Sequence, residues 1–435
     1  MSSAPSEEFD LGAEDSERPT GAGGGPGRGG LLRGSAIIAA ALGFTQLLAY
    51  VLSVTAAKTL PPDAFGSFGA LLNLVLIGTV LAFGLQAVVA RLVVTTPDAQ
   101  SDHLGTRVLG FSFRIAAIVG AILLALSPAI ALALRQPSVW PVVFAVLMLP
   151  PLTIAGCEFG LAQGHERHGR LAALLLINGV LRYAFGMAGL LGFGSVVATY
   201  AAMCLGTWVG AAVGLLLVRP MAGGTPLAVP GLRSQVLHAS HALLALYVAT
   251  SIDVLLARFW LPGAESGVYA VGALVSKVAF WLPSFVAVVT FPRMADERRG
   301  QTTVKAAAAV AGIGAIIVLG LALLPDLVLG LVAGPGYDAL GPYLWLFGLI
   351  GSAFSLAQFL LYSRIAVDDR SAVVALWISA ALIVAGVAVW HGSFAAVAAV
   401  VAAVAVALAL VGVLDLVRDN RRERLAGNPE GLAQR

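Results

Sequence analysis

Twelve apolar runs, each long enough to cross a lipid bilayer as a helix, follow one another along the chain with few residues between them. A helix needs roughly 20 residues to cross a hydrocarbon core about 30 Å thick. Hydrophobic residues make up 59% of the chain and charged residues 11%, more apolar surface than a water-soluble protein could cover. The sequence therefore predicts an all-α integral membrane protein. Its expected spans are residues 34–57, 65–92, 106–134, 138–162, 170–191, 195–218, 236–260, 267–291, 304–333, 341–366, 372–390 and 393–417.

Two of these spans, 106–134 and 304–333, are too long for one straight crossing. Pro128 and Pro325 lie near their outer ends. Because proline removes a backbone donor and clashes with the preceding turn, we expect each to break its helix.

The positions of the basic residues predict the orientation, since cytoplasmic loops retain Lys and Arg. With the N-terminus inside, 20 of the 26 Lys and Arg residues lie at inner ends, and only Lys58 and Arg135 lie outside. Residues 1–33, rich in Gly and acidic residues, are expected to be a disordered cytoplasmic tail. Residues 418–435 form a second, basic cytoplasmic tail. A multi-pass protein of the plasma (inner) membrane with both termini in the cytoplasm is expected.

A repeated motif divides the spans into two halves. LPPDAFGSFGA at Leu60–Ala70 returns as LPGAESGVYAV at Leu261–Val271, 201 residues later. LALSPAIALAL and LALLPDLVLGL recur at an offset of 197, and Pro141 and Pro342 at an offset of 201. The near-constant spacing predicts two six-helix lobes, residues 34–218 and 236–417, joined by a cytoplasmic linker at 219–235. Six is even, so the lobes are parallel pseudo-repeats.

The motif itself, Leu-Pro-x4-Gly-x-Phe/Tyr, is interpreted as an outer turn that fixes helix packing. We expect its proline to end the outgoing helix, its glycine to allow the turn, and its aromatic residue to lie at the membrane interface.

Several longer stretches carry a family resemblance: AKTLPPDAFGSFGALLNLV, TSIDVLLARFWLPGAESGVYAVGALVSKV, TFPRMA and GPGYDALGPYLWLF. They resemble the polysaccharide flippases of the MATE-like multidrug/oligosaccharidyl-lipid/polysaccharide exporter superfamily. The resemblance spans residues 34 to about 417. It implies a MATE-like exporter fold, with two lobes forming a V around a central cavity, and alternating access that carries a lipid-linked saccharide to the outer leaflet.

The predicted spans enclose four basic residues, Arg114, Arg182, Arg258 and Lys277. A charge facing lipid costs at least ~2.5 kcal/mol, so such groups are candidates for a functional site. Arg182 lies about 18 Å, and Lys277 about 15 Å, from the ends of their spans, at similar depth in opposite lobes. Asn178 shares the helix face of Arg182, and Trp281 shares that of Lys277. Cations suit a diphosphate, and tryptophan offers a flat surface for a sugar.

Each candidate also has a structural alternative. Arg182 and Lys277 could pair with a buried carboxylate or carbonyls, and Arg114 and Arg258 could extend to the interface. Asp253, inside span 236–260, could pair with Lys277 or bind a coupling cation. Glu158 lies near the inner end of its span, where we expect it to be solvated at the interface.

Other chemistries find no support. His165 and His168 in HERH have no third ligand nearby, and the Gly-rich tail lacks the Gly-Lys-Ser/Thr of a phosphate loop. The outer connections are too short to carry the active site of a polymerase. We therefore expect no catalytic residues, metal or cofactor.

The expected function is a non-enzymatic flippase that moves a lipid-linked oligosaccharide or polysaccharide precursor for cell-surface polysaccharide synthesis. The alternatives are a cation-coupled multidrug exporter of the same superfamily, and a non-transporting membrane scaffold for cell-envelope assembly. The expected partners are a polyprenyl-diphosphate-linked saccharide, membrane lipids and cell-envelope biosynthesis enzymes, with no nucleic acid.

Overall fold

The structure is a computed structural model that describes residues 28–290, 299–365 and 371–426. No strand occurs in these ranges. The predicted N-terminal tail and the last nine residues of the C-terminal tail lie almost wholly outside them.

Helices α1 to α8 form the first lobe. They are α1 (Arg28–Thr59), α2 (Pro62–Gly78), α3 (Val80–Thr95), α4 (Asp98–Ala133), α5 (Trp140–Leu147), α6 (Leu149–Gly164), α7 (His168–Phe193) and α8 (Val196–Val218). A short 3-10 helix, η1 (Arg219–Met221), follows. The second lobe contains α9 (Leu232–Ala249), α10 (Ile252–Trp260), α11 (Gly263–Thr290), α12 (Arg299–Leu323), α13 (Pro325–Val332), η3 (Asp338–Tyr343), α14 (Leu344–Ile365), α15 (Ser371–Val389) and α16 (Phe394–Ala426).

Ten helical stretches within the described ranges are long and apolar enough to cross a membrane. The pair α9 and α10, bent by 47°, makes up to 11, and Val373–Val389 is a shorter apolar helix. Each predicted span overlaps one of these segments. The chain is thus an all-α, multi-pass membrane protein.

The two prolines behave differently. Helix α12 ends at Leu323 and α13 begins at Pro325, which confirms the predicted break. Helix α4 instead runs unbroken through Pro128, so the break predicted there is wrong. A proline at 128 leaves the carbonyl of Leu124 without its backbone donor, and the Ser127 hydroxyl donates to that oxygen at 2.7 Å. The residue before Pro325 is Leu324, which offers no hydroxyl.

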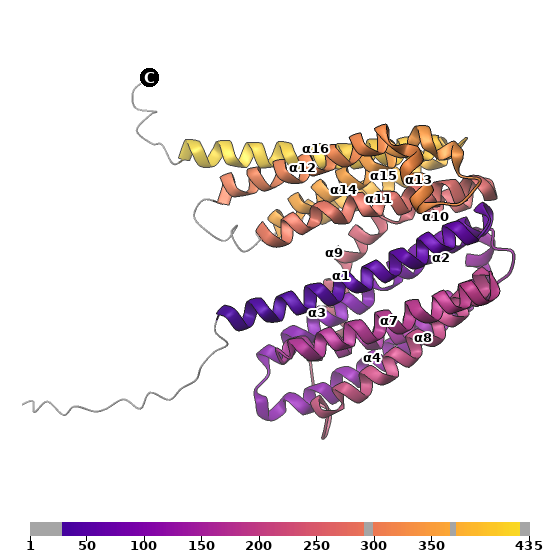
Figure 1. Cartoon of the computed structure of the whole chain (residues 1–435). Coiled ribbons are helices and arrows are strands. Elements are labelled where there is room, and N and C mark those ends of the chain that lie inside the picture. The colour runs from indigo at the N-terminus through magenta and orange to yellow at the C-terminus, as the bar shows by residue number, and fades with distance from the viewer. Residues whose placement is uncertain (1–27, 291–298, 366–370, 427–435) are drawn as a thin grey trace, which may run out of the picture.

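Figure 1 shows the two lobes lying against each other at the end that carries α2 and α10, and diverging toward the end where α1 begins and α16 ends. By the predicted orientation, the joined end is the outer one. Between the lobes, α2 packs on α10 and α11, while α9 packs on α3 of the first lobe as well as on α15 of its own.

The two copies of the repeated motif meet at this joined end. A Cβ on Gly66 of α2 would lie 2.9 Å from the backbone nitrogen of Gly267 in α11, and one on Gly267 would overlap the carbonyl oxygen of Pro62. One turn further, a Cβ on Gly69 would lie 3.0 Å from that of Ala270. We call this line of contacts, Pro62, Gly66 and Gly69 against Gly267 and Ala270, the glycine seam.

The seam corrects the interpretation of the motif. Its glycines lie inside α2 and α11 rather than in a turn, and they allow the two lobes to approach. Its aromatic residues, Phe68 and Tyr269, are fully buried rather than interfacial. The Tyr200 hydroxyl donates to the carbonyl of Phe68 at 2.8 Å, which ties α8 to α2.

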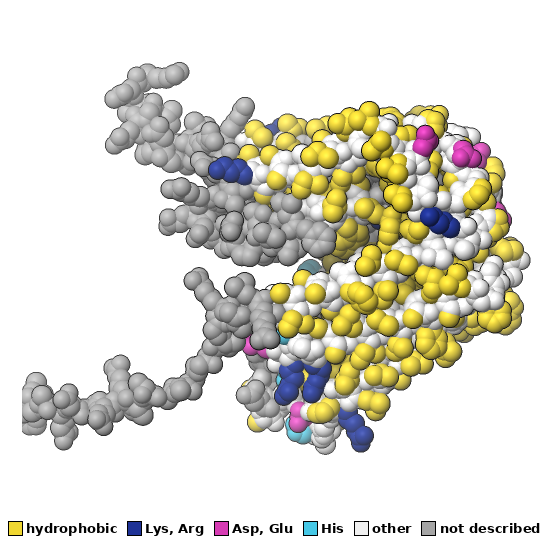
Figure 2. All heavy atoms as spheres, in the orientation of Figure 1, with side chains coloured by type: hydrophobic (Ala, Val, Ile, Leu, Met, Phe, Trp, Pro, Cys, Tyr) yellow, Lys and Arg dark blue, Asp and Glu magenta, His cyan; other side chains and the backbone are white. Residues whose placement is uncertain are grey.

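Apolar side chains cover most of the visible surface of both lobes (Figure 2). Helices α1, α4 and α12 are the least buried of the candidate spans, with 17%, 22% and 28% of their most apolar windows enclosed by protein. Such exposed apolar faces are what a bilayer covers.

Candidate functional site

Polar side chains connect the two lobes at three levels. At the inner end, Arg91 of α3 donates to the side-chain oxygen of Gln235 in α9 at 3.0 Å. The other two levels lie near the middle of the spans and at the outer end. At the middle, the Lys277 ammonium of α11 donates to the Asn73 side-chain oxygen of α2 at 2.6 Å. The Asn73 amide donates in turn to the carbonyl of Gly69 at 2.8 Å, which fixes the direction of its oxygen. We call the Lys277–Asn73 hydrogen bond the central contact. Asn73 is buried, whereas Lys277 is partly exposed.

Asp253 lies close to this contact but does not join it. Its carboxylate accepts a 2.8 Å hydrogen bond from the Tyr269 hydroxyl, and its second oxygen has no partner. The salt bridges within the described ranges do not include Asp253 and Lys277. Each group therefore has a neutral partner of its own, and the predicted direct charge pair is absent from this conformation.

Arg182 is held within the first lobe. Its guanidinium donates to the Tyr183 hydroxyl at 2.9 Å and lies 4.5 Å from the centre of that ring, while its Nε has no partner. The side chain is partly exposed. Asn178, one turn earlier, is buried against Gly210 of α8, and neither atom of its amide has a partner. The structure thus separates Arg182, which keeps some exposure, from Asn178, which has almost none.

Two further candidates, Arg114 and Trp281, lie on exposed surfaces. Arg114 is exposed on α4. Trp281 is 44% exposed on α11 and packs edge-on against Phe280. No described contact brings Arg114, Arg182 and Lys277 together.

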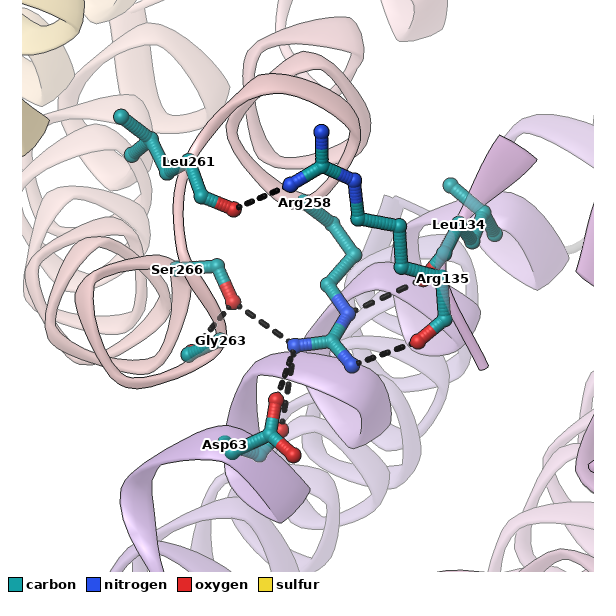
Figure 3. A network of polar contacts seen from close by, with 7 residues as sticks. All are labelled: Asp63, Leu134, Arg135, Arg258, Leu261, Gly263 and Ser266. Atoms are coloured by element: carbon teal, nitrogen blue, oxygen red, sulfur yellow. Dashed lines mark hydrogen bonds and ion pairs between the residues drawn. The ribbon is translucent and has the colours of Figure 1, made fainter. Parts of the chain in front are cut away.

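At the outer end, Arg258 of α10 reaches across to the first lobe (Figure 3). Its Nε donates to the carbonyl of Leu134 at 3.0 Å, and its Nη2 donates to that of Arg135 at 3.0 Å. Its Nη1 donates to the Asp63 carboxylate at 2.6 Å, to the Asp63 carbonyl at 3.3 Å and to the Ser266 hydroxyl at 2.9 Å. Four of the five acceptors belong to the first lobe, although the cation belongs to the second.

Helix ends explain why this position attracts a cation. The carbonyls of Leu134 and Arg135 follow the last turn of α4, where backbone acceptors lack helical partners and the helix dipole favours positive charge. Arg135 has a positive φ of 46°, and its own side chain donates back across the interface to the carbonyl of Leu261 at 3.3 Å. We call these contacts of Arg258 and Arg135 the outer network.

Arg258 is only 3% exposed, so its side chain is enclosed between the lobes rather than extended to the membrane surface. Asp63, by contrast, keeps 62% side-chain exposure. Lys58 adds a further link at the same end by donating to the carbonyl of Gly330 at 3.2 Å. Sequence reasoning did not single out Asp63 or Asn73. The sequence shows each of them only as a polar residue in or beside an apolar run, which does not identify a partner.

The arrangement defines a class: a two-lobed, all-helical membrane fold whose lobes diverge from the end that the outer network joins. Solved structures share it. An inward-facing multidrug MATE transporter of the MOP superfamily has a TM-score of 0.70 at 12% identity, over 86% of this chain and 94% of that one. The lipid II flippase MurJ in an inward closed conformation has a TM-score of 0.72 at 11% identity, over 88% and 89%. An outward-facing MATE transporter has a TM-score of 0.56 at 14% identity, over 90% and 95%.

The chain belongs to the polysaccharide biosynthesis protein family, whose model matches residues 31–297. Together with the fold, this membership confirms the resemblance to the MATE-like exporter superfamily. A comparison with functionally curated proteins finds no match.

Proposed function

We propose that this protein is a flippase that carries an anionic, lipid-linked saccharide across the plasma membrane by alternating access, during synthesis of a cell-surface polysaccharide. The observation that carries the proposal is the placement of charge inside the spans. Lys277 and Arg182 are both partly exposed, whereas Asp253 and Glu158 are 6% and 0% exposed. A cargo entering between the lobes would meet Lys277, which lies at the contact between α2 and α11, while both carboxylates are enclosed. Cations suit a diphosphate.

The pattern of lobe contacts supports the alternating-access part. The outer network ties the lobes at the outer end, and the lobes diverge toward the other end (Figure 1), where the packing of α9 on α3 and the Arg91–Gln235 hydrogen bond still join them. Opening the outer end requires Arg258 to leave its acceptors on the first lobe. The central contact is a single hydrogen bond, so a phosphate oxygen could replace the Asn73 oxygen on Lys277 without loss of a larger network.

Binding of undecaprenyl diphosphate to the purified protein in nanodiscs tests the proposal. Lys277→Gln and Arg182→Gln keep hydrogen-bonding capacity but remove the charge, and each should weaken binding by about 1.5–3 kcal/mol, the scale of a charged hydrogen bond. Arg114→Gln is the matched control, because it removes the same charge from an exposed position.

Three results would contradict the proposal. Equal losses in all three variants would mean non-specific attraction. Binding of a cationic dye but not of the diphosphate would favour the multidrug exporter. Absence of both kinds of binding, with intact folding, would favour the scaffold.

A further inference from the structure

Glu158, which plays no part in the contacts described so far, is the most completely enclosed acid among the described residues. It lies on α6 and has 0% exposure, which corrects the expectation of a solvated interfacial side chain. Its carboxyl group packs on α8, where a Cβ at Gly214 would overlap Oε2. Neither carboxyl oxygen has a hydrogen-bond partner.

No neighbouring helix supplies a counter-charge. Helices α3, α4, α5, α7 and α8 pack against α6, and α5 carries no titratable residue. Because both oxygens of Glu158 lack partners, none of the basic or titratable side chains within the neighbouring spans bonds to it. On these helices, those side chains are Arg91, Asp98, Asp102, His103, Arg107, Arg114, His168, Arg170, Arg182, Tyr183, Tyr200 and Cys204.

An ionised carboxylate in this position would be both unsolvated and unpaired. Burying an isolated charge costs far more than burying a neutral polar group. The carboxyl group of Glu158 is therefore neutral in this conformation, with its proton bound.

A second unsatisfied group lies beside it. Asn178 of α7 is 6% exposed, and both polar atoms of its amide lack partners. A Cβ on Gly210 would lie 3.3 Å from the Asn178 side-chain oxygen. Gly210 and Gly214 are four residues apart, so Asn178 and Glu158 face the same strip of α8 about 6 Å apart along its axis. Two buried side chains there retain unused hydrogen-bonding capacity.

The carboxyl group of Glu158 also lies close to the inner end of α6, where water is near. Glu158 lies six residues before Gly164, the last residue of α6, which corresponds to about 9 Å of helix. A small separation of α6 and α8 at their inner ends would admit water to the carboxyl group.

We propose that Glu158 is a proton-binding site in the first lobe that couples the transport cycle to protons. In the present conformation the carboxylic acid is intact. When α6 and α8 separate, its O–H bond breaks, the proton passes to water as hydronium, and the carboxylate is solvated. The coupling role rests on the proposed transport function, whereas the proton-binding site does not.

Labelling with dicyclohexylcarbodiimide tests the site independently of transport. This apolar reagent adds a protonated carboxylic acid across its C=N bond, and the adduct rearranges to a stable N-acylurea that mass spectrometry locates. Purified protein should carry the label on Glu158 at neutral pH, with less label as the pH rises. Glu158→Gln should lose it. The exposed Glu166 should remain unlabelled, and Glu166→Gln should leave the label on Glu158 intact.

Two further measurements complete the test. Glu158→Gln should fold to normal abundance with an unchanged Tm, because glutamine reproduces the neutral acid. In proteoliposomes that flip the lipid-linked saccharide, it should abolish the response of the rate to a proton gradient, which Glu166→Gln should preserve.

Absence of label on Glu158 in folded protein at any pH, or a large loss of stability in Glu158→Gln, would overturn the site. A full proton response in Glu158→Gln would overturn the coupling. Absence of saccharide transport by the wild-type protein, with Glu158 labelled, would contradict the proposed function and leave the site standing.

Discussion

The outer network and the central contact both join the first lobe to the second through a basic side chain, but they differ in redundancy. Arg258 is enclosed and donates to five acceptors, and Arg135 returns a bond in the other direction. Lys277 is partly exposed and has one acceptor, Asn73. The many hydrogen bonds of the outer network must therefore break together, whereas Lys277 can exchange its single acceptor, Asn73, for another.

The acceptors differ as well. Three of the five acceptors of Arg258 are backbone carbonyls, which no side-chain substitution can remove. The outer network therefore depends on its donor far more than on the Asp63 carboxylate. The central contact depends equally on both side chains.

The largest expected effect is the presence or absence of thiol labelling from outside the cell. It tests whether the end that carries the outer network faces outward. Ala264→Cys, exposed beside the outer network, should react with a membrane-impermeant thiol reagent in intact cells, whereas Ser234→Cys, exposed at the start of α9, should not. The native Cys157 and Cys204 are buried and contribute little background. External reaction at position 234 would reverse the orientation and make the outer network an inner one.

Arg258→Ala should have the largest energetic effect, because it removes five hydrogen bonds and leaves enclosed carbonyls without donors. We expect a loss of about 3–5 kcal/mol from outer closure. Spin labels at Ser138 and Ser393, in outer loops of opposite lobes, should report longer distances in this variant. The same labels with Arg114→Ala should report the wild-type distances, and an unchanged distribution in Arg258→Ala would show that other contacts hold the outer end.

The central contact should give a smaller, pairwise effect. A double-mutant cycle of Asn73→Ala and Lys277→Met should show a coupling energy of about 1.5–3 kcal/mol in thermal or denaturant unfolding. The cycle of Asp253→Ala with Lys277→Met should give less, since no salt bridge joins that pair. A larger coupling for Asp253 would mean that the two charges meet directly in the dominant state.

The smallest effect is expected from Asp63→Asn. Its side chain is 62% exposed. Without the Asp63 charge, Arg258 still donates to three backbone carbonyls and to the Ser266 hydroxyl. The Tm of Asp63→Asn should fall only slightly more than the Tm of Asp326→Asn, a control variant that changes an exposed acid. A fall in Tm as large as that of Arg258→Ala would show that the carboxylate, rather than the carbonyls, holds the arginine.

Sequence alone predicted the positions of the spans and the all-α membrane class, because both follow from apolar length. It also predicted the break at Pro325. It missed the continuity through Pro128, where the Ser127 hydroxyl donates to the carbonyl that the proline leaves free. Patterns of composition contain no such information.

The candidate site was harder to predict for a geometric reason. Counting residues from a helix end estimates the depth of a side chain but not whether it faces lipid, a cavity or protein. Arg114, Glu158 and Arg258 illustrate the three outcomes of that ambiguity: an exposed surface, an enclosed core and an interface between lobes. Asn73 and Asp63 acquire their partners in the other lobe through contacts about 200 residues away in sequence.

The glycine seam has a consequence for how the two halves could diverge. In a symmetric homodimer, equivalent residues of the two copies touch where the two-fold axis passes. Every interface residue of such a dimer must occur in both copies. Joining the copies in one chain removes that condition. At the repeat offset of 201, Arg258 corresponds to Ala57 and Asp63 to Ala264, while Gly66 still corresponds to Gly267. The single chain thus keeps the symmetric glycine seam but has only one copy of the outer network. A true homodimer would have to form that network twice.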